Sequence, residues 1–326
     1  MAGAGRDSIT AFGTGGPFEG FAPADFDAYL PKKWTSNAYT LERRKAKDKL
    51  LALCDAVRSE LSEELGQLDF MGSEEMPTVA NGRSVRAQWA FFLRPAEVRS
   101  GLKSQLNTTD LAAGAGLFDI AVQHQHACLT LRLDQDGVAV TVEFAAKAKV
   151  DRDNAAAKLA NDWAQTKLVE LCAELPGSAV IGVGDATKAA IETGVEDVQS
   201  WLEPLQGGAD LFRVEVLVPR DEPIVNEDAL IGTVVELVND VLPIYRYLAW
   251  SDDNDHCKLR ESMKKTEQTK KKEQLATLKP GDRVTILSGL FAGRPGYLAE
   301  VSASGKAKVM VGPVSVSVDA KDLKSM

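Results

Sequence analysis

The chain has 326 residues, of which 44% are hydrophobic and 26% are charged, a composition typical of globular proteins. No apolar run approaches the roughly 20 residues that a membrane-spanning helix needs, and the first residues lack the basic and apolar regions of a secretory signal. We therefore expect a cytoplasmic protein with no membrane partner. Two domains are expected, because single cores stop growing near about 250 residues.

The net charge of −9 is unevenly distributed along the chain. Lys258–Lys279 has eight Lys and Arg against three Glu and carries +5, Pro280–Met326 carries +2, and Met1–Cys257 carries −16. Any attraction to a polyanion is therefore expected from the C-terminal region. The four cysteines are far apart and form no CxxC pair, which predicts free thiols.

Composition and periodicity divide the chain into four parts. The predicted parts are a flexible Gly- and Ala-rich tail with an α+β domain of unknown function behind it, then a charged linker and a small β domain. Their bounds are residues 1–24, 25–250, 251–279 and 280–326, respectively.

The first half of the α+β domain predicts one long helix and then strands. Apolar residues recur at helical spacing between Thr40 and Gly66. They are Ala46, Leu50, Leu53, Cys54, Val57, Leu61 and Leu65. Residues 85–94 predict a strand and residues 96–106 a short helix or turn. Further strands are expected at 117–123, 126–133 and 138–148, the last two joined by a hairpin turn in which Gly137 can adopt positive φ.

The second half of this domain alternates helices and strands. Helices are predicted at 151–175, with Trp163 in the apolar stripe, at 185–205, and from an Asn226 cap to residue 250, interrupted before Pro243. Strands are predicted at 178–184 and 211–219. The expected fold is α+β, with one mixed, mostly antiparallel sheet and helices packed on it.

Few apolar residues occur in the linker, so an exposed helix or a charged tether is expected. Its lysines are candidates for binding nucleic acid or another partner, because each neutralised phosphate adds affinity through counterion release. These are Lys264, Lys265, Lys270, Lys271 and Lys272. A flexible tether without a binding role is the alternative.

The last residues predict four or five short strands punctuated by Gly and Pro, which favours a small β-barrel. The stretch GDRVTILSGLFAGRPGYLAEV, residues 281–301, resembles the KOW motif in the SH3-like barrel of NusG-type elongation factors and several ribosomal proteins. The matching residues are Gly281, Asp282, Val284, Ile286, Gly289, Phe291, Gly293, Gly296 and Val301. Gly293 and Gly296 are expected to permit a tight loop between the first two strands.

The resemblance implies a binding barrel used on RNA, ribosomal components, RNA polymerase or protein partners, without catalysis. Phe291 at the glycine loop and the adjacent Arg294 are the expected contact residues. Their structural alternatives are an aromatic plug of the barrel end and a solvated loop arginine.

Signals for chemistry in the large domain are weak. His124, His126 and Cys128 have zinc-binding atom types, but QHQH reads equally as a turn between strands, so no metal is expected. VIGVGDATK, residues 180–188, is similar to a phosphate loop, yet it lacks a third glycine and the GK[ST] ending. An ordinary strand-to-helix turn capped by Asp185 is preferred.

No catalytic arrangement emerges from the remaining motifs. Glu143 and Lys147 are two positions too far apart for the E-x-K spacing of metal nucleases, and no G-x-S-x-G elbow occurs. We therefore expect no cofactor and lean away from an enzyme. The basic run ERRKAKDK, residues 42–49, predicts the solvated face of the first helix, or an extension of a polyanion contact.

These observations favour a cytoplasmic adaptor whose KOW-like barrel and basic linker dock on RNA, a ribonucleoprotein or a transcription complex. The alternative is a scaffold protein whose barrel mediates protein binding or self-association only. The acidic large domain favours the alternative, because nucleic-acid binders are commonly basic throughout.

Overall fold

The computed structural model describes residues 16–79, 81–106, 122–207, 211–265, 269, 279–302, 306–319 and 322–325. The chain divides into two compact units, Met1–Cys257 and Lys258–Met326. Within the described residues, no helix is both long enough and apolar enough to cross a membrane.

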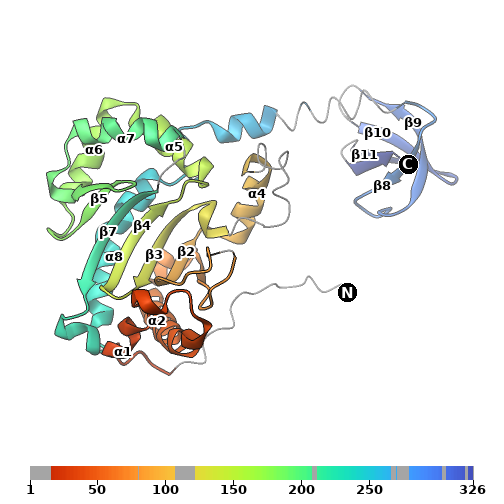
Figure 1. Cartoon of the computed structure of the whole chain (residues 1–326). Helices are drawn as coiled ribbons and strands as arrows, with labels where there is room; N and C mark the ends of the chain where they lie inside the picture. The colour runs from red at the N-terminus through yellow and green to blue at the C-terminus, as the bar shows by residue number, and fades with distance from the viewer. Residues whose placement is uncertain are drawn as a thin grey trace. The chain divides into compact units, whose positions relative to one another are not determined.

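The first unit is built on a seven-stranded antiparallel sheet with the order β1-β2-β3-β4-β7-β5-β6 (Figure 1). Every described strand pair is antiparallel, so the predicted α+β class with a mostly antiparallel sheet is confirmed. The strands are β1 (Asp69–Gly72), β2 (Gln88–Leu93), β3 (Ala127–Leu133), β4 (Gly137–Phe144), β5 (Val180–Val183), β6 (Ala186–Ala189) and β7 (Phe212–Pro219).

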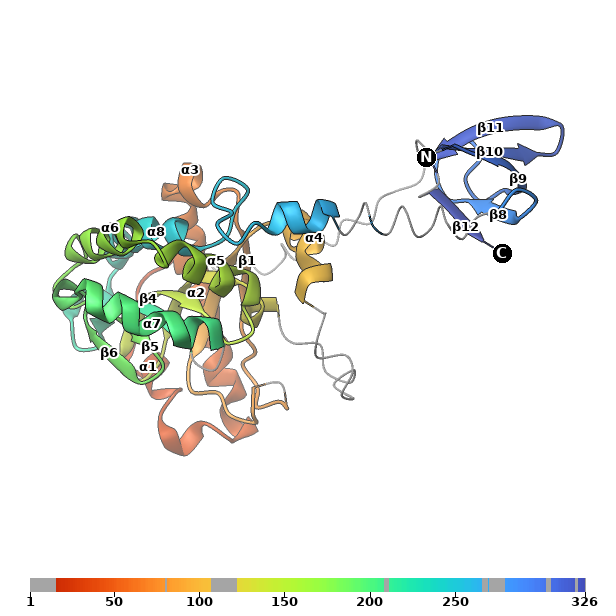
Figure 2. The ribbon, with the colours of Figure 1, turned by 90° about the horizontal axis from the view of Figure 1, so that it is seen from above.

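Helices α2 and α8 pack on one face of this sheet, against β2, β3 and β4. Figure 1 views the sheet from the other face, and Figure 2 shows α5, α6 and α7 lying beside one another. The helices are α1 (Pro23–Asp27), α2 (Thr40–Glu60), α3 (Ser62–Leu65), α4 (Ala96–Leu106), α5 (Lys149–Leu159), α6 (Asp162–Ala173), α7 (Val195–Gly207) and α8 (Leu230–Leu248). Short 3-10 helices are η1 (Pro31–Lys33), η2 (Asn37–Tyr39), η4 (Val122–His124), η5 (Ala190–Glu192) and η6 (Pro223–Asn226).

The main core lies between α2, α8 and the sheet. All seven apolar positions predicted for the first helix are buried. The alternating residues of β4 that point to this side are completely buried, which confirms the predicted alternation; they are Val138, Val140, Val142 and Phe144. A Cβ on Gly137 would lie 2.1 Å from the carbonyl oxygen of Val218, so the start of β4 requires glycine.

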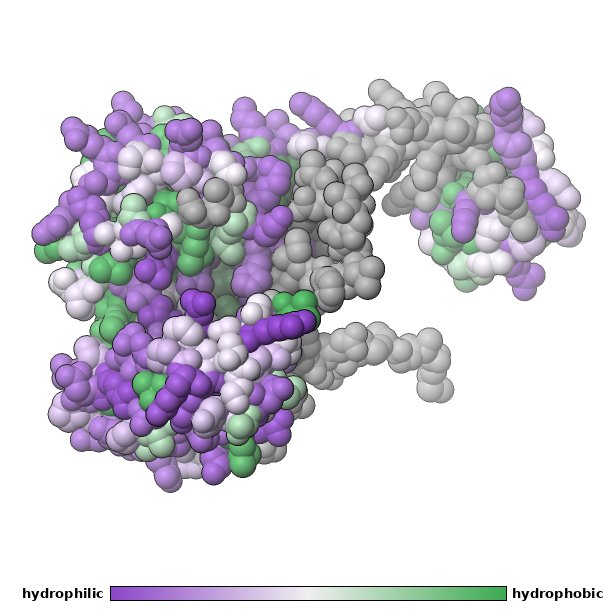
Figure 3. Space-filling model, in the orientation of Figure 1, coloured by the Kyte–Doolittle hydropathy of each residue, from purple (hydrophilic) through white to green (hydrophobic). Residues whose placement is uncertain are grey.

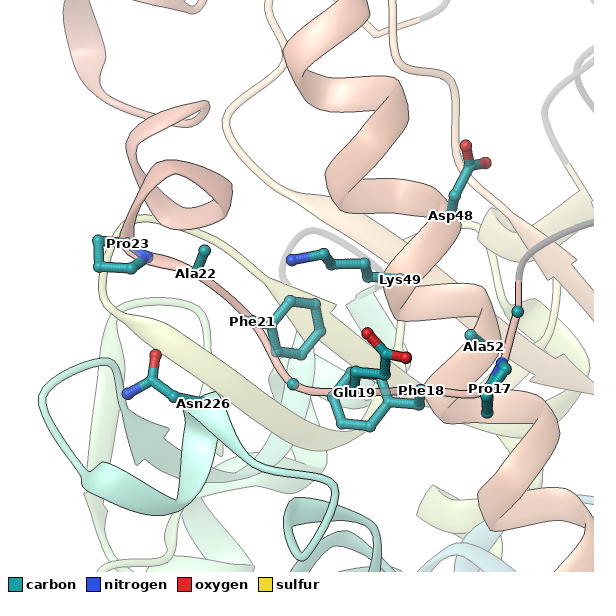
Figure 4. A pocket seen from close by; sticks show the side chains of 12 residues that line it. Pro17, Phe18, Glu19, Phe21, Ala22, Pro23, Asp48, Lys49, Ala52 and Asn226 are labelled. Carbon is teal, nitrogen blue, oxygen red and sulfur yellow. The ribbon is translucent and has the colours of Figure 1, made fainter.

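The N-terminal segment from Gly16 to Pro23 lies along α2 (Figure 4). The rings of Phe18 and Phe21 are 5.2 Å apart and buried, and the Phe21 N–H donates to the carbonyl of Val225 at 2.8 Å. Gly20 between them has φ of 101°, and a Cβ there would lie 2.3 Å from the carbonyl carbon of Asn226. Both aromatic residues therefore anchor this segment to the first unit.

Asp151 at the start of α5 joins three elements in the interior. Its carboxylate accepts hydrogen bonds from the backbone N–H of Ala127 at 2.7 Å and of Trp250 at 2.9 Å, and it pairs with Arg94. Burial opposes the charge of Arg94, but Asp151 outweighs that effect and raises the pKa of the guanidinium. A buried carboxylate with these partners fixes the start of β3 and the end of α8 together.

Three predictions about the second half of the unit are wrong. The helix expected at 151–175 breaks at Asn161 into α5 and α6, which resets the helical phase and leaves Trp163 58% exposed. The final helix begins at Leu230 and continues through Pro243, whereas Asn226 ends a 3-10 helix. Third, residues 185–205 were predicted as one helix, but the first part contains strand β6 and only the part from Val195 onward is helical.

The segment predicted as a strand-to-helix turn is a β-hairpin. Strands β5 and β6 pair from Val180 with Ala189 to Val183 with Ala186, and Gly184 in the turn has φ of 63°. Sequence periodicity missed this because glycine is needed at position 182 only once the strands pair: a Cβ there would lie 2.1 Å from the carbonyl oxygen of Ala186. Of the strand expected at 117–123, residues 117–121 lie outside the described residues. Val122 and Gln123 belong to the 3-10 helix η4.

The second unit contains a helical stretch at residues 259–265 and a five-stranded antiparallel sheet with the order β11-β10-β9-β8-β12. The strands are β8 (Arg283–Ile286), β9 (Pro295–Val301), β10 (Lys306–Val311), β11 (Val314–Asp319) and β12 (Leu323–Ser325). They curl into a half-barrel over a small core of Val284, Ile286, Leu298, Ala307, Val309 and Leu323. Strands β11 and β12 are the two edges of the described sheet.

Two glycines of the KOW-like stretch have different roles in this half-barrel. Gly293 has φ of 79° and donates its N–H to the carbonyl of Ile286 at 2.7 Å, which closes the tight loop as expected. Gly296 belongs to β9 instead. A Cβ there would lie 2.5 Å from Val309, so glycine permits the close approach of β9 and β10.

Candidate nucleic-acid interface

Two of the five candidate lysines, Lys264 and Lys265, are described, and they are exposed at the end of the helical stretch 259–265. Neither forms an ion pair with a described residue. The other three candidates, Lys270, Lys271 and Lys272, lie outside the described residues. Two exposed ammonium groups on one turn are available for a polyanion.

Phe291 and Arg294 lie in the loop between β8 and β9, which backbone hydrogen bonds fold tightly. The Arg294 N–H donates to the carbonyl of Phe291 at 3.1 Å, and the Ile286 N–H donates to the carbonyl of Arg294 at 3.1 Å. The Phe291 ring is partly buried and packs against the half-barrel core, whereas Arg294 is exposed. The contacts of Phe291 therefore agree with the alternative interpretation, in which this aromatic side chain closes the end of the core.

The outer face of the half-barrel presents an aromatic residue beside a cation. Along β9, Gly296 and Leu298 are buried and Tyr297 between them is 58% exposed. Tyr297 is directly opposite Arg283 on β8 and Met310 on β10. Directly opposite residues in an antiparallel pair have Cβ atoms about 5 Å apart, so Arg283 and Tyr297 form one continuous surface.

Cations prevail over acids around this tyrosine. Among the described residues, Arg283, Arg294 and Lys324 are exposed and form no ion pair. Lys308 pairs with Glu300 at 3.0 Å, but both side chains are more than 60% exposed, so a polyanion can displace this weak contact. Lys324 on β12 is opposite Thr285, which is two residues after Arg283 on β8, so the two cations lie on neighbouring strands.

The same loop also exposes two leucines. Leu290 at its tip is fully exposed and Leu287 is 54% exposed. Isolated exposed leucines are common, but a fully exposed one at a loop tip is suited to a pocket on a protein partner.

Sequence reasoning missed Arg283 and Tyr297 as surface residues and named only Phe291 and Arg294 as contact residues of the half-barrel. The signal was present in the alternation of β9, because Leu298 pointing inward requires Tyr297 to point outward. What the sequence lacked was the register that places Arg283 opposite it.

The candidate metal ligands of the first unit are not brought together. His124 is exposed in η4, His126 is buried, and the Cys128 thiol donates to the carbonyls of Gln123 and His126 at 3.3 Å. Burial, and after it the charge of Arg94, lowers the pKa of His126 to about 4. Within the described ranges, no group of three His, Cys, Asp or Glu side chains is placed to hold a metal ion.

Two other sequence candidates have internal partners. Lys188, near the loop similar to a phosphate loop, pairs with Asp197 at 2.9 Å. In the basic run of α2, Arg43 is buried and donates to backbone carbonyls. Three of the four cations after it pair with acids, Arg44 and Lys47 with Glu75 and Lys49 with Asp25, whereas Lys45 is exposed. Most cations of this run are therefore engaged in contacts within the first unit and do not form a free basic face.

Comparisons with known proteins leave the chain unplaced: no family model matches it, and no curated protein matches it significantly.

Proposed function

We propose that the second unit is a KOW-like SH3-type module that docks this protein on single-stranded RNA, free or within a ribosome or transcription complex. The observation that carries the proposal is Tyr297, 58% exposed on a sheet face beside Arg283, which forms no ion pair with a described residue. Aromatic side chains on a sheet stack on unpaired bases, while neighbouring cations neutralise phosphates.

The charge distribution supports the same assignment. Lys258–Lys279 and Pro280–Met326 carry net charges of +5 and +2, whereas Met1–Cys257 carries −16. An acidic body repels RNA, so contact is directed to the half-barrel and to the exposed Lys264 and Lys265. In this proposal the first unit binds a protein partner or self-associates, and the protein acts as an adaptor.

A titration of the full chain with a labelled 12-nucleotide oligouridine, followed by fluorescence anisotropy at several salt concentrations, tests the proposal. Tyr297→Ala is expected to weaken binding by about 5- to 100-fold, because stacking on one base contributes about 1–3 kcal/mol. Tyr297→Phe is the matched control and should retain the affinity, since the ring remains. Arg283→Gln should reduce the salt slope by about 0.7, the value for one phosphate contact on a single strand.

Absence of binding at low salt, or equal affinity of Tyr297→Ala and the natural chain, would overturn the proposal. Binding to duplex RNA with no loss in Tyr297→Ala would point to phosphate attraction alone.

A protein-only role is the second candidate, favoured by the fully exposed Leu290 and by the free edge strand β11. Unpaired strand edges accept another strand through backbone hydrogen bonds. Light scattering of the full chain distinguishes it. Self-association that Leu290→Asp abolishes, in a chain that does not bind oligouridine, would establish this role instead.

A further inference from the structure

A cavity of about 860 Å³ lies in the first unit, on the sheet face that α2 and α8 leave uncovered. Figure 3 views this side of the unit and shows its surface hollowed over the sheet. Residues from the β1–β2 region, η4 and the end of β4 line the cavity. Its volume lies within the range of about 300–1,000 Å³ that binds small organic molecules.

Apolar side chains form much of the cavity wall. Trp89 and Phe91 lie two residues apart on β2. Their ring centroids are 6.0 Å apart and their ring planes are within 9° of parallel. With Met71 and Val122 they belong to a small apolar cluster separate from the main core. Such a wall offers dispersion contacts to a flat or apolar body, and the Arg132 guanidinium already lies over the Trp89 ring at 5.5 Å from its centroid.

The charged groups on this sheet face are unequally distributed. Glu215 accepts two hydrogen bonds from Arg132, at 2.7 and 3.0 Å, and an Arg213 nitrogen lies 3.7 Å from the same carboxylate. Arg213 is directly opposite Glu143 in the sheet, yet it is Glu215 that it approaches within ion-pair distance. Among the described residues, no Lys or Arg forms an ion pair with Glu143.

Two buried acceptor atoms at the cavity have no hydrogen-bond partner among the described residues. One is Oε1 of Glu143 and the other is Oε1 of Gln123. A buried carboxylate oxygen without a donor is costly, and a ligand that supplies the donor recovers that cost. Arg86 also lines the cavity, but its guanidinium lies over the Trp34 ring at 4.8 Å.

We propose that this cavity binds a small organic cation, an amine carried on a flat apolar body, with Glu143 as the counter-ion and Trp89 and Phe91 against the body. The net charge of −16 on Met1–Cys257 favours the arrival of a cation. Gln123 can accept a second hydrogen bond from the same ammonium group, which has three donors. The inference is independent of the half-barrel and of RNA.

Calorimetric titration of the full chain at pH 8 with three indole probes tests the proposal. The probes are tryptamine, a cation, indole-3-ethanol, its neutral counterpart, and indole-3-acetate, an anion. Tryptamine is expected to bind at least about tenfold more tightly than the other two, the factor that corresponds to one hydrogen bond to a charged group. Glu143→Gln should remove that preference.

Glu74→Gln is the matched control, because Glu74 also lines the cavity but is exposed. It should change tryptamine affinity by less than about threefold, as expected for a screened charge. The proposal fails if no probe binds at millimolar concentration, if the three probes bind equally, or if Glu143→Gln retains the preference for tryptamine. The probe series on the natural chain decides the matter even if a variant does not fold.

Discussion

Glu143 provides a test of the cavity that needs no ligand. Burial, opposed by Arg132 and Arg213 and assisted by Glu215, raises the pKa of this carboxyl to about 7 from an ordinary value of 4.5. A carboxyl whose pKa is higher in the folded state contributes stability at low pH, and that contribution is lost as the pH rises from about 4.5 to about 7. At 1.36 kcal/mol for each pKa unit, ionised Glu143 destabilises the fold by about 3 kcal/mol above pH 7.

The variant Glu143→Gln removes this titration while preserving the shape of the side chain. It should therefore be more stable than the natural chain by up to about 3 kcal/mol at pH 8 and nearly equal to it at pH 4.5. Glu215→Gln on the same face should behave oppositely at pH 8, with a loss of about 2 kcal/mol, because it weakens the two hydrogen bonds from Arg132.

Urea unfolding followed by tryptophan fluorescence measures both variants. All five tryptophans precede residue 258, so the signal reports on the first unit alone. A stability difference between Glu143→Gln and the natural chain that does not change between pH 4.5 and 8 would refute the reasoning, as would a variant less stable at pH 8. A gain in stability is typical where a costly group is retained for function.

Two further predictions concern the frame of the first unit. Gly20→Ala should cost about 2 kcal/mol, because φ of 101° strains any other residue, whereas Gly16→Ala, with open space around it, should be neutral in the same urea assay. Asp151→Asn should cost about 3–5 kcal/mol by leaving Arg94 buried without its counter-ion, and Asp153→Asn, an exposed position two residues later, should cost under about 0.5 kcal/mol. Similar values for the two aspartate variants would contradict the importance given to the buried pair.

The two units differ in the kind of binding surface that they offer. The half-barrel has a core of only six buried residues and presents its outer face, which suits an extended partner. The first unit has an extensive core on one sheet face and a cavity on the other, which suits a small ligand.

The sequence determined the local elements wherever one periodicity prevailed. The buried stripe of the first helix, the alternation of Val138 to Phe144, and the short strands after residue 280 all follow from residue spacing, because one face of each element must leave water. Gly137 and Gly293 were likewise placed at turns by their type.

Only the tertiary structure decided which residues meet. The hairpin of β5 and β6 replaces a predicted helix start because pairing with β7 outweighs local preference. Strand register puts Arg283 beside Tyr297. Two arginines approach Glu215, whereas Glu143 forms no ion pair with another described residue. These contacts join residues far apart in the chain, and the local spacing of residues determines neither their distances nor their burial.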